Sequence, residues 1–425
     1  MQRPWPVPAF VAVEGFVETE TTSHALAERL LPAVRQVMEV YDVTPGDARA
    51  GYSARFRGRL LLDSAEAYQR LEPAFEREDM TLLFRKGSPD HVALAVPGRI
   101  RSGASNPWIN LLLFLVTLAS VLIAGATTDE SLAASDGSIV GFLTALLRAL
   151  PSGLPFAGSL LAILLAHEFG HYLAARRHGT AVSLPYFLPF PFSVFGTMGA
   201  FIRLKQPPRN RRVLLDIGLA GPLAGLAVAV PVLLIGLALS QVERLPSTPA
   251  LAGTGSLIEG NSILYLLAKY VVTGQFLPAP ASYGGISPVL YWLRYVLIGR
   301  PLPYGAMDVM LHPVAWAGWA GILVTALNLI PAGQLDGGHV LYVLLGDRAS
   351  RIMPFVVVGL VGLGIAWSGW WLWAGLVFFL GRSHAQPLDE ITPLDGGRRA
   401  LAVFGLLVFF LVFTPVPLQP LGLAF

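Results

Sequence analysis

Two patterns of hydrophobic and polar positions divide the chain. Over residues 1–100 short apolar runs alternate with charged residues, whereas from residue 106 onward long apolar stretches are separated by turns. About 20 apolar residues in a helix suffice to cross a lipid bilayer. We therefore expect a mainly α, polytopic helical membrane protein in residues 101–425, with its core at 106–345, preceded by a small soluble α/β domain at residues 1–100.

The first hundred residues predict helices that alternate with strands. Leu26, Leu30, Val34 and Val37 recur with a helical period, and Ser64 is of a type that caps helices. The expected elements are helices at Ala25–Val40 and Ser64–Phe75 and strands at Ala54–Leu62, Leu82–Phe84 and Val92–Val96. Nothing in this part has the spacing of a catalytic site.

The remainder of the chain predicts six or seven membrane spans. The candidates are Trp108–Ala126, Leu154–Ala175, Val213–Leu239, Val314–Pro331, Ile352–Ala366, Trp371–Leu380 and Ala400–Thr414. The fifth and sixth are short, so they need tilting or shelter and are expected to form a helical hairpin. The tryptophans at 367, 370, 371 and 373 are typical of a belt at the membrane interface.

One apolar segment cannot be a regular helix. Ser183–Lys205 contains Pro185, Pro189 and Pro191 and then the strand-like run Met198–Leu204. The segment could form a re-entrant β-hairpin whose edge pairs with an unwound peptide segment, and the family resemblance given below favours this interpretation. The simpler alternative is an aromatic loop at the membrane interface.

Basic residues predict the orientation. Arg176–Arg212 contains seven Lys or Arg and no acid, which places this side, together with residues 1–100, in the cytoplasm. The loop with Asp129, Glu130 and Asp136 should then lie outside a cell membrane that the chain crosses several times. Met1–Phe10 is too short and too rich in proline for a secretory signal.

Composition narrows the possible functions. The chain is 54% hydrophobic and 13% charged, whereas soluble domains are about one quarter charged. It has no cysteine, which excludes disulfides, thiolate metal sites and cysteine nucleophiles. The net charge of +3 comes from basic residues beside the spans, so no nucleic-acid partner is expected.

Candidate metal chemistry lies inside the second span. Between Arg148 and Arg176 the only charged residue is Glu168, flanked by His167 and His171. Residues four apart share a helix face, about 6 Å apart along the axis, so both imidazoles can bind one metal while the carboxylate acts as a base. A carboxylate in lipid costs about 2.5–3.5 kcal/mol on insertion scales, so a purely structural role is the weaker interpretation.

A catalytic zinc ion usually has three protein ligands. Asp336, in the run Leu335–Gly338, is the candidate for the third, because Pro331 should end the fourth span and the glycines let the backbone turn toward the metal. Taken alone, the run would more often be a turn at a membrane edge. Asn328 could donate a hydrogen bond to a developing oxyanion.

Three blocks of the chain resemble the site-2 protease family of intramembrane zinc metalloproteases, in particular its archaeal, bacterial and plastid branch with an N-terminal α/β domain. They are His167–His171, Gly196–Ala200 and Asn328–Gly338. The resemblance implies one Zn²⁺ per chain bound by His167, His171 and Asp336, with Glu168 activating water and Asn328 stabilising the transition state. It also implies regulated intramembrane proteolysis, in which transmembrane segments of other proteins are cut within the lipid bilayer.

Two other functions stay open at this point. Intramembrane His, Glu and Asp residues also mark ion pathways, so a transporter is conceivable, although the sequence shows no convincing internal repeat. An inactive protease homologue that acts as a membrane scaffold is the second alternative. Zinc content together with cleavage of a model membrane peptide would separate these functions from a protease.

Overall fold

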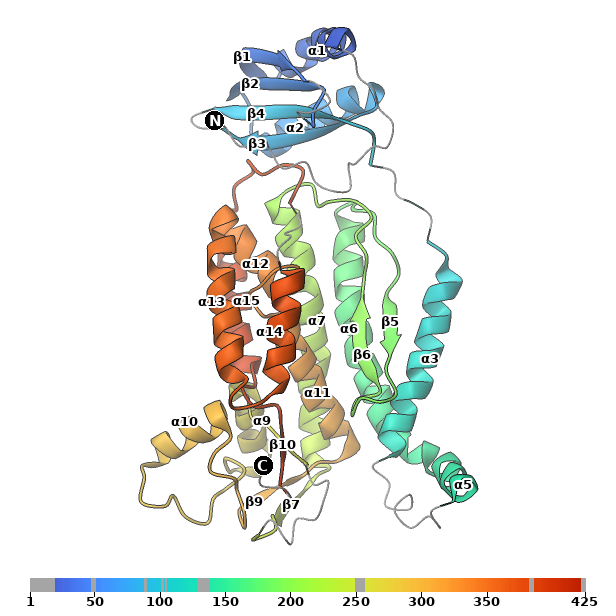
Figure 1. The fold of residues 1–425 in the computed structure, drawn as a ribbon, viewed down its shortest axis with the longest axis vertical. Coiled ribbons are helices and arrows are strands. Elements are labelled where there is room, and N and C mark those ends of the chain that lie inside the picture. Colours follow the sequence, from blue (N-terminus) through green and yellow to red (C-terminus); the bar gives the residue numbers. More distant parts are fainter. Residues whose placement is uncertain are drawn as a thin grey trace.

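The architecture comes from a computed structural model, which describes residues 20–46, 51–87, 90–100, 103, 105–127, 138–248, 257–381 and 386–421. Figure 1 shows a small α/β module at one end of a long helical bundle. The residues on which the signal-peptide and acidic-loop predictions depend lie outside the described ranges.

The α/β module contains two helices and one antiparallel sheet. Its elements are α1 (Glu20–Arg35), β1 (Met38–Pro45), β2 (Ala54–Leu60), α2 (Ser64–Arg77), β3 (Met80–Lys86) and β4 (His91–Pro97), with strand order β1-β2-β4-β3. The predicted helix Ala25–Val40 is wrong at its C-terminal end, because residues 38–40 already belong to β1. The N-cap of α2 is Asp63, whose carboxylate accepts a hydrogen bond from the Ala65 amide, and not Ser64.

A segment from the far end of the sequence completes this module. Residues 386–392, which we call the bridging segment, lie beside the edge strand β3: the Phe84 amide donates to the Leu388 carbonyl (2.9 Å), and the Glu390 amide donates to the Phe84 carbonyl (3.2 Å). Leu388 and Ile391 belong to the hydrophobic core of the module. The buried Arg85 donates to the Leu388 carbonyl over 3.0 Å, so a charged side chain fastens the segment to β3.

The helical bundle is built around three long apolar helices. Among the described residues, α3 (Pro107–Ala126), the continuous run of α5 (Ile139–Ala149), η2 (Leu150–Gly153) and α6 (Leu154–Arg177), and α7 (Arg211–Ala238) are long enough to cross a membrane. The other helices are shorter: α9 (Ile263–Thr273), α10 (Pro288–Ile298), α11 (Pro313–Asn328), α12 (Asp336–Leu345), α13 (Ala349–Leu363), α14 (Gly369–Leu380) and α15 (Gly396–Val412). The mainly helical membrane fold is thus established, and the six or seven spans stay a prediction.

The proline-rich segment forms a β-hairpin. β5 (Tyr186–Pro189) pairs antiparallel with β6 (Thr197–Phe201), and the hairpin runs beside α3 and α6 (Figure 1). Two polar side chains of α3 hold it: the Asn110 amide donates to the Pro185 carbonyl (2.9 Å), and the Ser120 hydroxyl donates to the Gly196 carbonyl (2.6 Å). β5 lies mainly beside α3 and β6 lies beside α6, so β6 is the strand turned toward the bundle (Figure 1).

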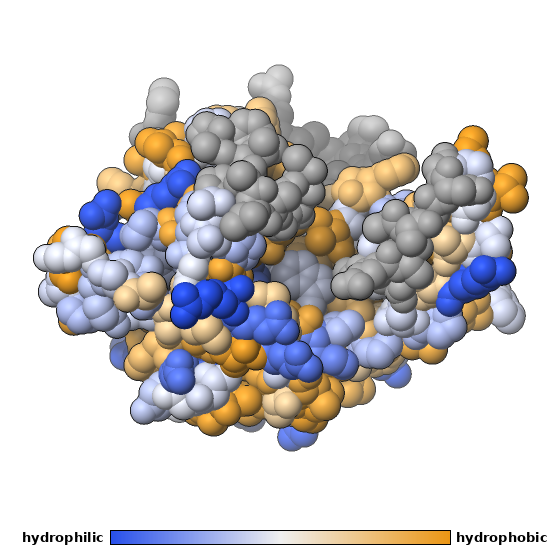
Figure 2. Space-filling model, turned by 90° about the horizontal axis from the view of Figure 1, so that it is seen from below, coloured by the Kyte–Doolittle hydropathy of each residue, from blue (hydrophilic) through white to orange (hydrophobic). Residues whose placement is uncertain are grey.

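The end of the bundle remote from the module carries short strands. β7 (Gln241–Arg244) pairs with β9 (Met307–Met310), and β8 (Leu257–Glu259) pairs with β10 (Leu418–Pro420). Hydrophilic and hydrophobic residues are interspersed on this end face (Figure 2). The predicted tryptophan belt is wrong for Trp370, which is fully buried and donates from its indole to the Pro415 carbonyl, whereas Trp371 is exposed.

Candidate active site

Helix α6 carries two histidines and a glutamate into the interior. His167, Glu168 and His171 are all buried, and the Nε2 atoms of the two histidines lie 3.2 Å apart. The four-residue spacing therefore does place both imidazoles on one face of a helix, as the sequence predicted.

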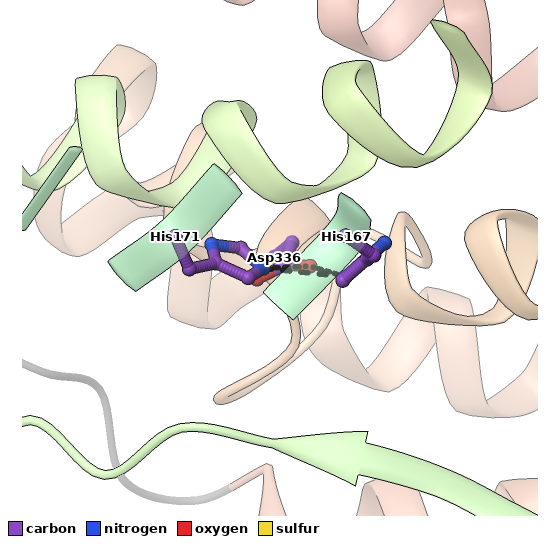
Figure 3. A group of neighbouring side chains, drawn as sticks. All are labelled: His167, His171 and Asp336. Atoms are coloured by element: carbon purple, nitrogen blue, oxygen red, sulfur yellow. Dashed lines mark hydrogen bonds and ion pairs between the residues drawn. The ribbon is translucent and has the colours of Figure 1, made fainter. Parts of the chain in front are cut away.

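Asp336 reaches this pair from a distant part of the chain. It is the first residue of α12, and its Oδ2 atom lies 3.4 Å from Nε2 of His167 and 3.3 Å from Nε2 of His171 (Figure 3). The backbone turn that brings it there needs a glycine at 337, because a Cβ atom at this position would lie 1.9 Å from the Leu329 carbonyl oxygen.

Two further groups contact the pair. The Nδ1 atom of His171 lies 2.7 Å from the backbone carbonyl oxygen of Ile217, in α7. The side-chain amide nitrogen of Asn328, the last residue of α11, lies 3.3 Å from Nε2 of His167. A carbonyl that accepts from one ring nitrogen is a typical partner of a metal-binding histidine, because it fixes the tautomer and leaves the other nitrogen free for the metal.

The donor set fits a zinc ion. One ligand atom from each of His167, His171 and Asp336 lies within 4.8 Å of the others, and no second group of this kind occurs in the described part of the chain. Two imidazoles and one carboxylate are the protein ligands of a well-known class of catalytic zinc site. The geometry thus brings together all three residues that the sequence singled out.

The site opens into a cavity of about 620 Å³. His167, Glu168, His171, Asn328 and Asp336 line it, together with Ala200, Phe201 and Ile202 in and after β6 and Leu214, Ile217 and Gly218 on α7. Pro208 and Gln386 also line it, and the Pro208 carbonyl accepts from the Leu388 amide (3.1 Å). The cavity therefore extends from the metal site toward the α/β module.

A polar network near this site was not predicted. Asp216 of α7 accepts from Arg398 Nε (3.0 Å) and Nη2 (2.7 Å), and its Oδ2 atom lies 3.0 Å from His178 Nε2. The sequence signal for this network was the carboxylate of Asp216 near the start of an apolar span, because a charged group there requires a partner.

The Leu-Asp-Gly-Gly sequence occurs twice. At 394–397 it begins α15, where Asp395 caps the helix and forms a 2.7 Å ion pair with Arg398. Only the copy at 335–338 brings its carboxylate to the histidines. The sequence string therefore marks a metal ligand only when the fold delivers it to the imidazole pair.

In a core of apolar helices, His167, Glu168 and His171 lie together with the Asp336 carboxylate beside one cavity, and this is the donor set of a membrane-embedded metallopeptidase centre. Residues 155–366 match the model of Peptidase family M50. The chain belongs to this family, the site-2 protease family, whose resemblance the sequence motifs had indicated. The family and the relatives support a zinc-dependent protease.

The chain is similar to several curated plant proteins. It is 32% identical over 324 residues to "Probable zinc metalloprotease EGY1, chloroplastic" of Oryza sativa subsp. japonica, covering 73% of this chain and 50% of that protein. It is 30% identical over 376 residues to "Probable zinc metalloprotease EGY2, chloroplastic" of Arabidopsis thaliana, covering 85% of this chain and 60% of that protein. The chain thus spans about half to three fifths of these relatives. No solved structure gives a significant match.

Proposed function

We propose that the protein is an intramembrane zinc metalloprotease that hydrolyses peptide bonds within or near transmembrane segments of other membrane proteins. The observation that carries this proposal is the meeting of His167, His171 and Asp336 at a cavity within an apolar helical bundle. The three residues act as zinc ligands, and the substrates are membrane proteins in the surrounding bilayer.

Glu168 and Asn328, the remaining polar groups of the site, have separate roles in the proposed hydrolysis. When bound, zinc acidifies water and polarises a peptide carbonyl. The carboxylate of Glu168, which lies beside the ligands on the same helix and lines the cavity, takes a proton from the attacking water and passes it to the leaving amine. The amide of Asn328, whose nitrogen lies 3.3 Å from Nε2 of His167, would donate a hydrogen bond to the developing oxyanion.

The substrate must present an extended backbone, because the amides of a helix are closed in internal hydrogen bonds. Strand β6 offers an edge for such a backbone: β5 pairs with one side of it, and Ala200 and Phe201 line the same cavity as the histidines. We therefore assign the hairpin a place at membrane depth, as a re-entrant element that holds the unwound substrate by strand addition.

The proposed orientation places the α/β module in the cytoplasm and the bundle in the cell membrane. The module lies at the same end of the bundle as the basic Arg176–Arg212 segment, which supports this arrangement (Figure 1). Because the chain has no cysteine, single substitutions report the topology. Gln69→Cys should react with a membrane-impermeant maleimide only from the cytoplasmic side and Ala281→Cys only from the other; the reverse pattern would refute the orientation.

Cleavage by the purified protein tests the activity. Zinc-loaded wild type in detergent or liposomes should cut a single-pass substrate, and Glu168→Gln should keep its zinc but lose cleavage by about 10²–10⁴-fold. Undiminished cleavage by Glu168→Gln would overturn the role of this residue. A zinc-loaded wild type that cuts no membrane peptide would favour the scaffold, and metal flux into liposomes would favour the transporter.

A further inference from the structure

Three glycines of α7 lie at the spacing of one helix face, Gly218, Gly221 and Gly225. A Cβ atom at 221 would lie 2.0 Å from Nε2 of His171, and one at 225 would lie 3.1 Å from Nδ1 of His167. The two imidazoles thus occupy the space that side chains would take at these two positions. Glycine at 221 and 225 therefore leaves room for the two histidine rings.

Gly218 differs from its two neighbours on this face. A Cβ atom there would meet only the Cβ atom of His339, at 3.4 Å, and the carbonyl oxygen of Asp336, at 4.0 Å, both at ordinary contact distance. The residue lines the catalytic cavity. The absence of a side chain at 218 is therefore not required by packing and instead leaves space next to a proposed zinc ligand.

We propose that Gly218 determines which substrate side chain fits beside the scissile bond, and that this side chain is aliphatic and of leucine size. The inference rests on the proposed function and deepens it. Leu214, Ile217 and Leu335 line the same cavity as Gly218, so part of its lining is aliphatic, while His339 and Asp336 lie nearest to Gly218 itself. Alternate side chains of a strand point to opposite faces of its sheet, so a substrate strand paired with β6 would present every second side chain to the same face of the extended sheet.

The test is a series of single-pass substrates that differ only at the residue next to the cut, with Ala, Leu or Phe there; the cut is first located by mass spectrometry. Wild type should prefer Leu over Ala. One methylene more or less in an apolar pocket changes kcat/KM about 10–200-fold, so Gly218→Ala should lower the Leu-to-Ala ratio at least about tenfold, and Gly218→Val further. In a Glu168→Gln background, binding of the same substrates should show the same order.

Two other glycines provide matched controls. Gly158→Ala, on the exposed face of α6 where a Cβ meets nothing within 4 Å, should leave the Leu-to-Ala ratio at its wild-type value. Gly221→Ala should lose zinc and cleavage of every substrate, because its Cβ displaces the His171 ring.

The outcomes are distinct. Equal losses for all three substrates in Gly218→Ala, an unchanged ratio, or a wild type indifferent to the varied residue would each overturn the role of Gly218. A zinc-loaded wild type that cuts none of the three contradicts the proposed protease itself. Selectivity for Leu that Gly218→Ala abolishes supports both.

Discussion

The Nδ1 atom of His171 lies 2.7 Å from the backbone carbonyl oxygen of Ile217. A carbonyl oxygen only accepts, so Nδ1 donates this hydrogen bond, and Nε2 is the ring nitrogen that faces Asp336, 3.3 Å from its Oδ2 atom. The orientation of this proposed metal ligand on α6 is thus set by the backbone of α7. Packing of the two helices and metal affinity are therefore coupled.

Zinc binding should depend on one of the two Leu-Asp-Gly-Gly sequences and not on the other. Asp336→Ala removes a proposed ligand and should lower bound zinc below about 0.2 per chain, with loss of activity. Asp395→Ala, in the same four-residue context, should keep about one zinc per chain, because Asp395 caps α15 instead. Metal analysis after dialysis measures the zinc content of both variants. Full zinc in Asp336→Ala would mean that this carboxylate is no ligand.

Removal of the Asn328 amide should slow the chemical step. The loss of one oxyanion donor costs about 10²–10³-fold in kcat in enzymes that stabilise such charge. Asn328→Ala should therefore lower kcat by this order while KM and zinc content change little. Steady-state kinetics with a membrane peptide decide the point. A change confined to KM would instead assign the residue to substrate binding.

The network of His178, Asp216 and Arg398 should stabilise the bundle. Asp216→Asn removes the charge that two guanidinium nitrogens and an imidazole face, and hydrogen bonds to charged groups contribute about 1.5–3 kcal/mol each. We expect a clear fall in the thermal midpoint. The matched control is Glu66→Gln, which breaks the exposed i,i+4 pair with Arg70 and should cost under about 0.5 kcal/mol. Equal shifts in both variants would contradict a structural role for Asp216.

Docking of the α/β module on the bridging segment should weaken as the pH rises. Burial raises the pKa of Glu72, Asp389 and Glu390, which lie where the module meets the segment and the preceding loop. The docked state then binds protons more tightly than the undocked state, so docking is strongest below about pH 4, near the ordinary values, and declines as the pH passes through the raised values.

Hydrogen exchange at the amides of Phe84 and Glu390 measures this docking, because both amides bond across the interface. Protection factors, corrected for the intrinsic rate, should fall at least about threefold between pH 5 and pH 8. In Asp389→Asn the fall should be smaller. Protection factors that rise with pH would show that attraction to nearby arginines lowers the pKa of these acids more than burial raises it.

The clustering of His167, His171 and Asp336 was predictable because its main signal is local. His167 and His171 are four residues apart on one helix, and the apolar surroundings exclude most reasons for a charge between them. Asp336 needed the additional motif, since a lone Leu-Asp-Gly-Gly sequence does not identify a ligand, as the copy at 394–397 shows.

Long-range pairings left no signal in the sequence. The bridging segment joins Phe84 to Leu388 and Glu390 through backbone atoms, which every residue type possesses. The boundary error at Val40 has a local cause: the helical period ends at Val37, and the following β-branched and aromatic residues favour a strand.

The contribution of Leu388 and Ile391 to the core of the α/β module has a consequence for biosynthesis. As the chain leaves the ribosome, the module is made first but lacks these two residues until nearly all of the helical bundle has been synthesised and inserted. The core of the module is therefore completed late in the synthesis of the chain. A chain that stops before residue 386 would carry a module with an uncovered edge strand, a ready substrate for quality-control proteases.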